Sequence, residues 1–194
     1  MKKLIFIVLI TGAAITSGFA QSSSFSIQYS IGFGGNMNNY ISSTSLRGAT
    51  FEYKVNPSPN FSIGLDAGWN YFYERRAYDS YTKGTLTLSG IQYRYSHSVP
   101  IFVTSSYYFS PGDQINPFVG MGVGTMFVSR YTDMGIYRVT EDNWHFALKP
   151  EAGIRVSANP DMDLTFAFRY NHAFATSDVM EQSYMTFNIG FVWK

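Results

Sequence analysis

The chain has 194 residues, of which 14% are charged and 18% aromatic, and its formal net charge at pH 7 is +1. Soluble globular proteins carry roughly 25% charged residues. Because no long basic or acidic run occurs, the composition argues against nucleic acid as a partner. The absence of cysteine excludes a disulfide framework and a cysteine-ligated metal site. Mean hydropathy is close to zero, so apolar and polar positions must be finely interleaved.

The first twenty residues have the three parts of a secretory signal peptide. Two lysines follow the initial Met, an apolar run occupies residues 4–10, and small residues lead up to Ala20. The alternative, an N-terminal membrane helix, needs ~20 apolar residues, and this run is too short for it. We therefore expect cleavage after Ala20, so that residues 1–20 are a signal peptide and residues 21–194 are the exported domain.

Beyond Ala20 apolar residues recur at every second position, which is typical of β-strands with two different faces. No apolar stretch in this part is long enough for a transmembrane helix. The alternation predicts eight strands, and it leaves open whether the fourth begins as early as Leu86. We expect them at about 25–34, 48–55, 61–73, 93–109, 118–127, 144–156, 162–171 and 185–193.

The connections between these strands alternate in length. Short turns rich in Pro and Asn are expected at 56–60, 110–116 and 158–161. Longer polar loops are expected at about 36–45, 74–90, 129–143 and 175–182. Bacterial barrels show this asymmetry, with short turns and both termini in the periplasm and longer loops outside.

Aromatic residues flank an aliphatic middle on one face of the strands. In the fourth strand, tyrosines lie on either side of Val99, Ile101 and Val103, as an aromatic girdle at two membrane interfaces would require. The predicted fold class is therefore all-β, a closed antiparallel eight-stranded transmembrane β-barrel. The girdle is expected to include Trp69, Tyr71, Tyr93, Tyr107, Trp144, Tyr170 and Trp193.

The opposite face of the strands carries charged side chains that would project into the lumen. They are Glu52, Lys54, Asp66, Arg94, Lys149, Glu151, Arg155, Asp163 and Arg169. A soluble barrel or a β-sandwich is the alternative fold, but the cavity of a soluble barrel is apolar. An eight-stranded barrel is only just wide enough for its inward side chains. We predict a charge-compensated polar plug, with a narrow gated pore as the alternative.

Three segments carry a resemblance to a known family: residues 116–124, the hairpin from Lys149 to Tyr170, and residues 187–193. In these the sequence resembles the outer membrane protein β-barrel domain family, the small OmpA-, OmpX- and OmpW-like barrels of Gram-negative bacteria, over residues 22–194. The resemblance implies localisation in the bacterial outer membrane. It also implies outer-membrane lipids, lipopolysaccharide and the barrel-assembly machinery as partners. The segments are not specific for any activity, and we expect no catalytic residues, cofactor or metal.

Two motifs suggest other chemistry. Gly120, Gly122 and Gly124 do not have the spacing of a phosphate-binding loop, and we expect them to make room for large inward neighbours such as Phe118 and Met126. His172, together with Asn171 and Ser177, invites comparison with barrel lipid A deacylases, in which a Ser, a His and an acid act together. The contiguous His-x-Ser-Asn pattern of those enzymes is absent, so an interfacial role for His172 is favoured.

The predicted external loops are rich in tyrosine and arginine, a composition suited to recognition when a rigid scaffold holds the loops. They contain Arg75, Arg76, Tyr78, Asp79, Tyr81, Lys83, Arg130, Tyr131, Asp133, Tyr137, Arg138, Glu141 and Asp142. The function predicted is a structural or interaction scaffold that displays these loops, with an extracellular ligand as a further expectation. A small channel for ions or hydrophobic solutes and a lipid A-modifying enzyme are the alternatives.

Overall fold

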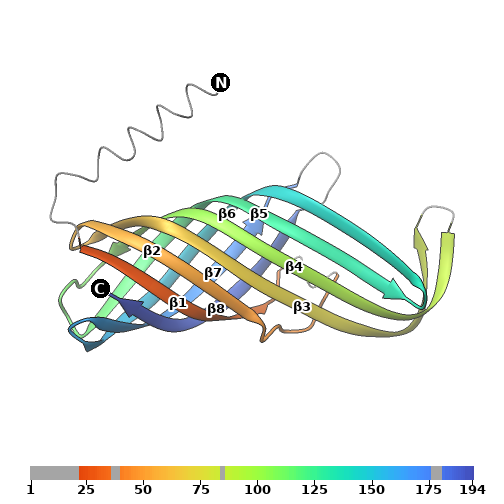
Figure 1. The fold of residues 1–194 in the computed structure, drawn as a ribbon, viewed down its shortest axis with the longest axis horizontal. Helices are drawn as coiled ribbons and strands as arrows, with labels where there is room; N and C mark the ends of the chain where they lie inside the picture. The colour runs from red at the N-terminus through yellow and green to blue at the C-terminus, as the bar shows by residue number, and fades with distance from the viewer. Residues whose placement is uncertain (1–21, 36–39, 84–85, 176–180) are drawn as a thin grey trace, which may run out of the picture.

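A computed structural model describes residues 22–35, 40–83, 86–175 and 181–194. The predicted signal peptide and Ser177 lie outside these residues. Within them the chain forms eight strands in sequence order (Figure 1). The strands are β1 (Ser22–Phe33), β2 (Gly48–Ser58), β3 (Phe61–Lys83), β4 (Leu86–Tyr108), β5 (Ile115–Met134), β6 (Tyr137–Asn159), β7 (Met162–Ala173) and β8 (Gln182–Trp193).

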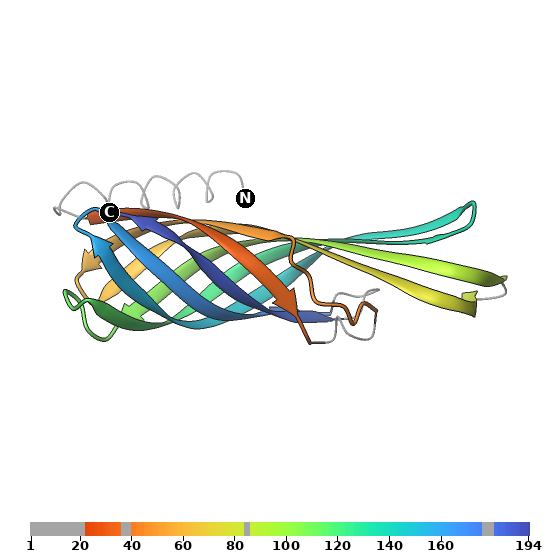
Figure 2. The same cartoon turned by 90° about the horizontal axis from the view of Figure 1, so that it is seen from below.

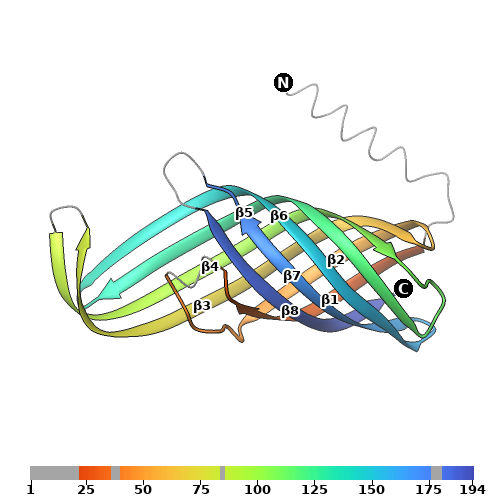
Figure 3. The same cartoon turned by 180° about the vertical axis from the view of Figure 1, so that it is seen from behind.

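Each strand pairs antiparallel with the next, and β1 pairs with β8 to close the ring (Figure 3). The closing register runs from Phe25 opposite Trp193 to Phe33 opposite Met185. The predicted fold class, a closed antiparallel eight-stranded barrel, is confirmed. Closure leaves no free strand edge in the barrel wall, so every backbone group there can pair without water.

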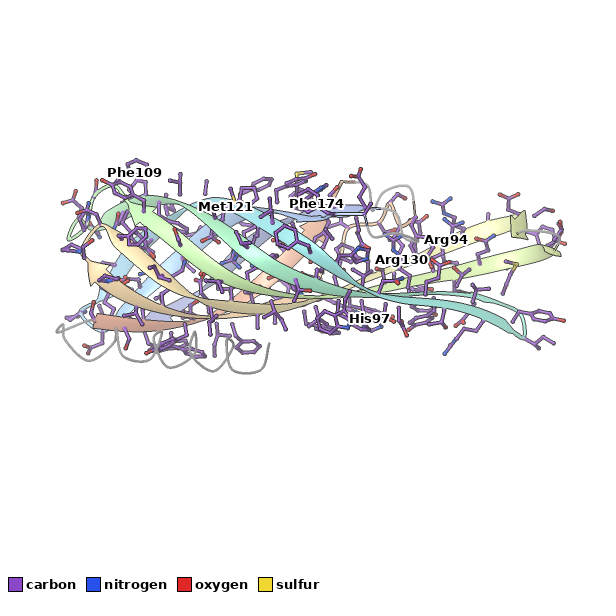
Figure 4. All side chains as sticks on the ribbon, turned by 90° about the horizontal axis from the view of Figure 1, so that it is seen from above. Arg94, His97, Phe109, Met121, Arg130 and Phe174 are labelled. Carbon is purple, nitrogen blue, oxygen red and sulfur yellow. The ribbon has the colours of Figure 1, made fainter. Side chains whose placement is uncertain are left out.

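The alternation in the sequence determines which side chains enter the lumen. In β8, Thr186 and Asn188 are buried inside, whereas Phe187, Ile189 and Phe191 are exposed on the outer surface. The apolar surface continues around the barrel, where Phe109, Met121 and Phe174 project outward at successive heights (Figure 4). Among the described residues the outer surface is thus mostly apolar and most of the buried side chains are polar, the reverse of a soluble barrel.

The short connections and both ends of the described chain lie at one end of the barrel (Figure 1). β2 continues to Ser58, past the predicted turn start, because a register shift between Val55 and Ser58 accommodates Pro57. The turn itself is confined to Pro59 and Asn60. The other two short connections, at 109–114 and 160–161, lie close to where the sequence predicts them.

At the opposite end the predicted loops 74–90 and 129–143 are wrong, because both segments belong to β-hairpins that extend far beyond the barrel (Figure 2). The start of the fourth strand at Leu86, which the sequence left open, is found in β4. The ladders of the hairpins continue through Glu74 opposite Arg94, Arg94 opposite Thr132 and Thr132 opposite Val139. This sheet lies beyond the closed barrel and has no polar lumen on one side and apolar outer wall on the other, so its strands lack the alternation that identifies the others. We call this four-stranded continuation of β3, β4, β5 and β6 the extension.

Candidate functional site

Six charged side chains form one ion-pair network inside the barrel, here called the lumen network. They are Glu52, Lys54, Asp66, Lys149, Glu151 and Arg169, and each is at most 5% exposed. The shortest contacts join Lys54 to Glu52 at 2.8 Å, Lys149 to Asp66 at 2.9 Å and Arg169 Nε to Glu151 at 3.0 Å. Three cations face three anions, so the network is neutral as a whole.

Arg169 connects the network across the lumen. Besides Glu151, its guanidinium lies 3.3 Å from Asp66 and 3.7 Å from Glu52. Neutral neighbours add hydrogen bonds, since the Ser106 hydroxyl donates to Glu151 at 3.2 Å. Removing charges from water is costly unless each one finds an opposite charge and further hydrogen bonds. Every charge of the lumen network has an opposite charge at 3.0 Å or less, although Glu52 Oε1, Glu151 Oε2 and Arg169 Nε form no hydrogen bond within the described residues.

Apolar layers cover the lumen network at both ends. Toward the short turns lies the cluster of Tyr108, Phe118 and Ala167. Toward the extension lies a larger cluster formed by Ile41, Phe72, Phe102, Met126, Val128, Ala147, Ala173 and Tyr184. Lys54 lies 5.7 Å from the ring centre of Phe118 and Lys149 lies 5.5 Å from that of Phe102, so aromatic rings contact the network from both sides. The described lumen is filled in three successive layers.

Glycines leave the space that these inward side chains occupy. A Cβ atom on Gly122 would lie 3.1 Å from Cε of Lys149, and one on Gly120 would lie 2.7 Å from Glu151. The neighbours of these β5 glycines are therefore charged residues of the lumen network, together with Phe102, and not Phe118 and Met126 as expected. It is Gly153 on β6 that makes room for Phe118, at 2.8 Å.

Three residues of the predicted inward set lie away from the lumen network. Arg155 stacks over the ring of Tyr108 at 4.8 Å, and Asp163 pairs with Lys194 at 2.7 Å. Both line a cavity of about 310 Å³ at the short-turn end. Arg94 lies at the opposite end, at the base of the extension (Figure 4). All three lie at positions whose side chains alternation directs inward. Alternation determines the face of the strand on which a side chain lies, but not its height along the barrel.

Two residues of the connection between β1 and β2, Tyr40 and Ile41, lie across the mouth of the barrel below the extension, and we call this arrangement the Tyr40 closure. The ring of Tyr40 lies 5.2 Å from the guanidinium of Arg94 and 5.3 Å from that of Arg130. Its hydroxyl bonds to Thr132 at 2.8 Å, and its carbonyl accepts a hydrogen bond from Arg94 at 3.0 Å. The next residue, Ile41, is buried in the apolar cluster. Sequence analysis missed this closure because Tyr40 and Ile41 lie in a non-alternating segment.

A carboxylate on β3 anchors the same connection. Glu74 accepts hydrogen bonds from the backbone N–H and the hydroxyl of Ser42 and from Nε of Arg76. Burial acts to raise the pKa of the Glu74 carboxyl, but these hydrogen bonds outweigh it and hold the pKa below its usual range. On the extension, the hydrogen bonds from Arg138 likewise lower the pKa of Asp133.

Most of the predicted girdle residues lie on the outer surface of the barrel. Trp69, Tyr107, Trp144, Tyr170 and Trp193 are exposed, and Tyr71 is half-buried between Trp69 and His97. Tyr93 lies farther out than expected, opposite Asp133 near the end of β5. It lines a cleft of about 580 Å³ between the two hairpins.

The histidines are held by structural contacts. His172 faces outward between the rings of Tyr170 and Phe174, with Glu181 at 4.0 Å. His145 is buried, and its Nδ1 bonds to the carbonyl of Phe174 at 2.9 Å. Ser177, the serine considered for the lipid A-modifying alternative, falls outside the described residues. The parts of the chain that the structure describes contain no group of three or more metal-ligating side chains.

The same fold occurs in solved outer-membrane barrels. Neisserial surface protein A superposes with a TM-score of 0.57 at 13% identity, over 91% of this chain and 99% of that one. The outer membrane protein OprG from Pseudomonas aeruginosa gives 0.56 at 13% identity, over 89% and 96%. No family model and no curated protein matches the sequence. Among the described residues, no helix has the length and apolar character to span a bilayer.

Proposed function

We propose that this chain, which has the fold of the small outer-membrane barrels, is an integral bacterial outer-membrane protein that acts as a sealed scaffold for the extension. The outer surface supports membrane insertion, because exposed Ile, Leu, Val and Phe side chains form its middle and aromatic residues flank them. In this proposal the short turns face the periplasm, the extension lies outside, and the signal peptide of residues 1–20 is removed on export.

The observation that carries the proposal is the filled lumen. An ion crossing the barrel would have to separate the pairs of the lumen network and pass the apolar cluster around Phe72, Phe102 and Tyr184. The Tyr40 closure adds a further barrier at the mouth. The described interior therefore supports a plug, and it favours a scaffold over the channel for ions or hydrophobic solutes.

A catalytic role is not part of the proposal. The contacts of His172 are aromatic rings and one carboxylate, as expected for a side chain at a membrane interface. Lipids and lipopolysaccharide are the proposed surroundings of the barrel, the barrel-assembly machinery its route of insertion, and an extracellular ligand a partner of the extension. None of these roles requires a cofactor.

The test is single-channel conductance of residues 21–194, refolded into detergent and reconstituted in planar bilayers. Heat-modifiable gel migration first establishes that a barrel has formed. We expect a folded barrel without discrete conductance steps. Steps that change on Arg169→Gln substitution would support the channel instead, and a chain that never inserts into the bilayer would contradict the membrane assignment.

A further inference from the structure

The extension leaves one regular strand edge without a neighbour. β6 pairs with β5 from Tyr137 to Val156 with no register shift, but it pairs with β7 only from Ala147 onward. Phe146 still accepts a hydrogen bond from the backbone N–H of Phe174. Within the described ranges, no strand pairs with the outer edge of Tyr137–His145. We call this segment the β6 edge; it contains neither Gly nor Pro.

The edge of β3 on the other side of the extension is less suited to pairing. Its ladder with β4 is interrupted by a register shift between Arg76 and Asp79. The connection from β1 also reaches it, through the hydrogen bonds of Ser42 to Glu74. Irregularities and covering loops are the usual protection of an edge strand, and a regular edge without them is a template for another strand. Of the two outer edges of the extension, the one on β6 is therefore better suited to pairing than the one on β3.

We propose that the β6 edge pairs antiparallel with the β6 edge of a second copy of this chain. The inference rests on the proposed placement of the extension outside the membrane. When a strand pairs antiparallel with its own copy, one residue lies opposite itself on a two-fold axis. With Thr140 on that axis, Arg138 of each copy faces Asp142 of the other. Placing the axis at Arg138 or at Asp142 would instead bring like charges together.

The side chains of Arg138 and Asp142 are placed so that they can form ion pairs with a second copy. Asp142 is exposed and forms no ion pair within the described residues. Arg138 uses Nε and Nη2 to bind Asp133, at 2.6 and 2.8 Å, and its side chain remains 62% exposed. Its third nitrogen, Nη1, can therefore donate to the second copy. Opposite charges and Thr–Thr contacts directly across an antiparallel pair stabilise a sheet, and like charges destabilise it.

An exposed apolar side chain supports the same register. Ile136, at the tip of the β5–β6 hairpin, is 93% exposed. With Thr140 on the axis it lies opposite Trp144 of the second copy, and Trp144 is itself 58% exposed. Pairing would cover both side chains on the outward face of the joined sheet, where burial of apolar surface is favourable.

The direction of the strands determines how the two copies meet. Antiparallel pairing places the barrels at opposite ends of the joined sheet, so the partners lie in facing membranes. Phe146 of the two copies would be separated by about 40 Å, twelve residues at the rise of an antiparallel strand. Such a two-fold contact is closed, so it yields pairs of barrels and not a growing polymer.

The first experiment uses the absence of native cysteine. A Thr140→Cys variant is placed in lipid nanodiscs that hold one barrel each and is oxidised mildly. Opposed residues of an antiparallel pair have Cα atoms about 4.5–5.5 Å apart, which suits a disulfide. We expect covalent pairs, whereas Ser89→Cys, exposed on the other hairpin, should remain single. Equal cross-linking of the two variants would overturn the proposal.

The second experiment exchanges the charges. Asp142→Arg discs and Arg138→Asp discs should each associate roughly tenfold or more weakly than the parent in sedimentation, because like charges then oppose each other. Mixing the two populations should restore pairing, since each variant complements the other. The β6 edge pairing would be refuted if Asp142→Arg discs associated as strongly as the parent, or if parent barrels inserted but stayed single. Neither result would contradict the proposed membrane barrel. Chains without heat-modifiable migration would contradict the membrane barrel as well.

Discussion

Replacing Glu151 by glutamine is the most direct test of how the lumen is filled. The carboxylate contacts Arg169 at 3.0 Å and both Lys54 and Lys149 at 3.4 Å. Glu151→Gln keeps the shape of the side chain but leaves three cations facing only Glu52 and Asp66. Breaking a buried pair by neutralising one partner costs about 3–5 kcal/mol. We expect a loss of that size in the free energy of unfolding.

The assay is urea unfolding in lipid vesicles, followed by tryptophan fluorescence and by heat-modifiable migration. A matched control removes one cation at the same time: Glu151→Gln with Lys54→Met again has equal numbers of cations and anions and should recover most of the loss. If Glu151→Gln costs less than about 1 kcal/mol, the lumen charges are hydrated. That result would refute the sealed interior and favour a water-filled pore.

Three further predictions concern the packing and the mouth of the barrel. Gly153→Ala places a Cβ 2.4 Å from the carbonyl oxygen of Phe166, so we expect a loss of about 1–3 kcal/mol in urea unfolding. Gly90→Ala is its control, since there the new Cβ meets Met134 at an ordinary 3.5 Å; equal losses would contradict the packing. Phe72→Ala should lower the free energy of unfolding by about 3–5 kcal/mol. It should also remove the steric clash of Gly32→Ala, because the new Cβ would lie 2.7 Å from the Phe72 ring. Additive losses in the double variant would contradict that contact. The pKa of the Glu74 carboxyl is held below its usual range, so the carboxylate stabilises the folded state. This stabilisation is fully present above about pH 4.3, the pKa of a glutamate in an unfolded chain. It is lost as the pH falls through the lower pKa of the folded state. Parent and Glu74→Gln should therefore differ in unfolding free energy at pH 7 and converge at acid pH; a constant difference would contradict this account.

The barrel wall could be predicted from the sequence because the lipid-facing requirement imposes strict alternation. Phe25, Ile27 and Tyr29 on β1 face outward for this reason, and the same rule indicated the inward parity of Glu52, Asp66 and Arg169. Parity identifies the face but not the height. Arg94, Arg155 and Asp163 therefore have the predicted orientation and lie at other levels of the lumen.

The extension could not be predicted, because nothing forces its strands to alternate. Glu74, Arg75 and Arg76 are consecutive charges on β3, a pattern that indicates a loop, yet all three pair with β4. The apolar layers of the lumen were also missed. Phe72 and Phe102 occupy inward positions that alternation assigns to polar residues, and only the folded barrel shows that they pack against Tyr184 and Lys149.

The closing pair of strands has a consequence for the order of assembly. Seven of the eight ladders join consecutive strands, but the ladder between β1 and β8 joins the two ends of the described chain. Hairpins close short loops and form quickly, whereas the first and last strands must await the whole sheet between them. Until Phe25 stacks on Trp193 and Asn188 reaches Ser30, both strands present open edges. Folding should therefore end at this seam, and the nascent barrel is most prone to aggregate just before it closes.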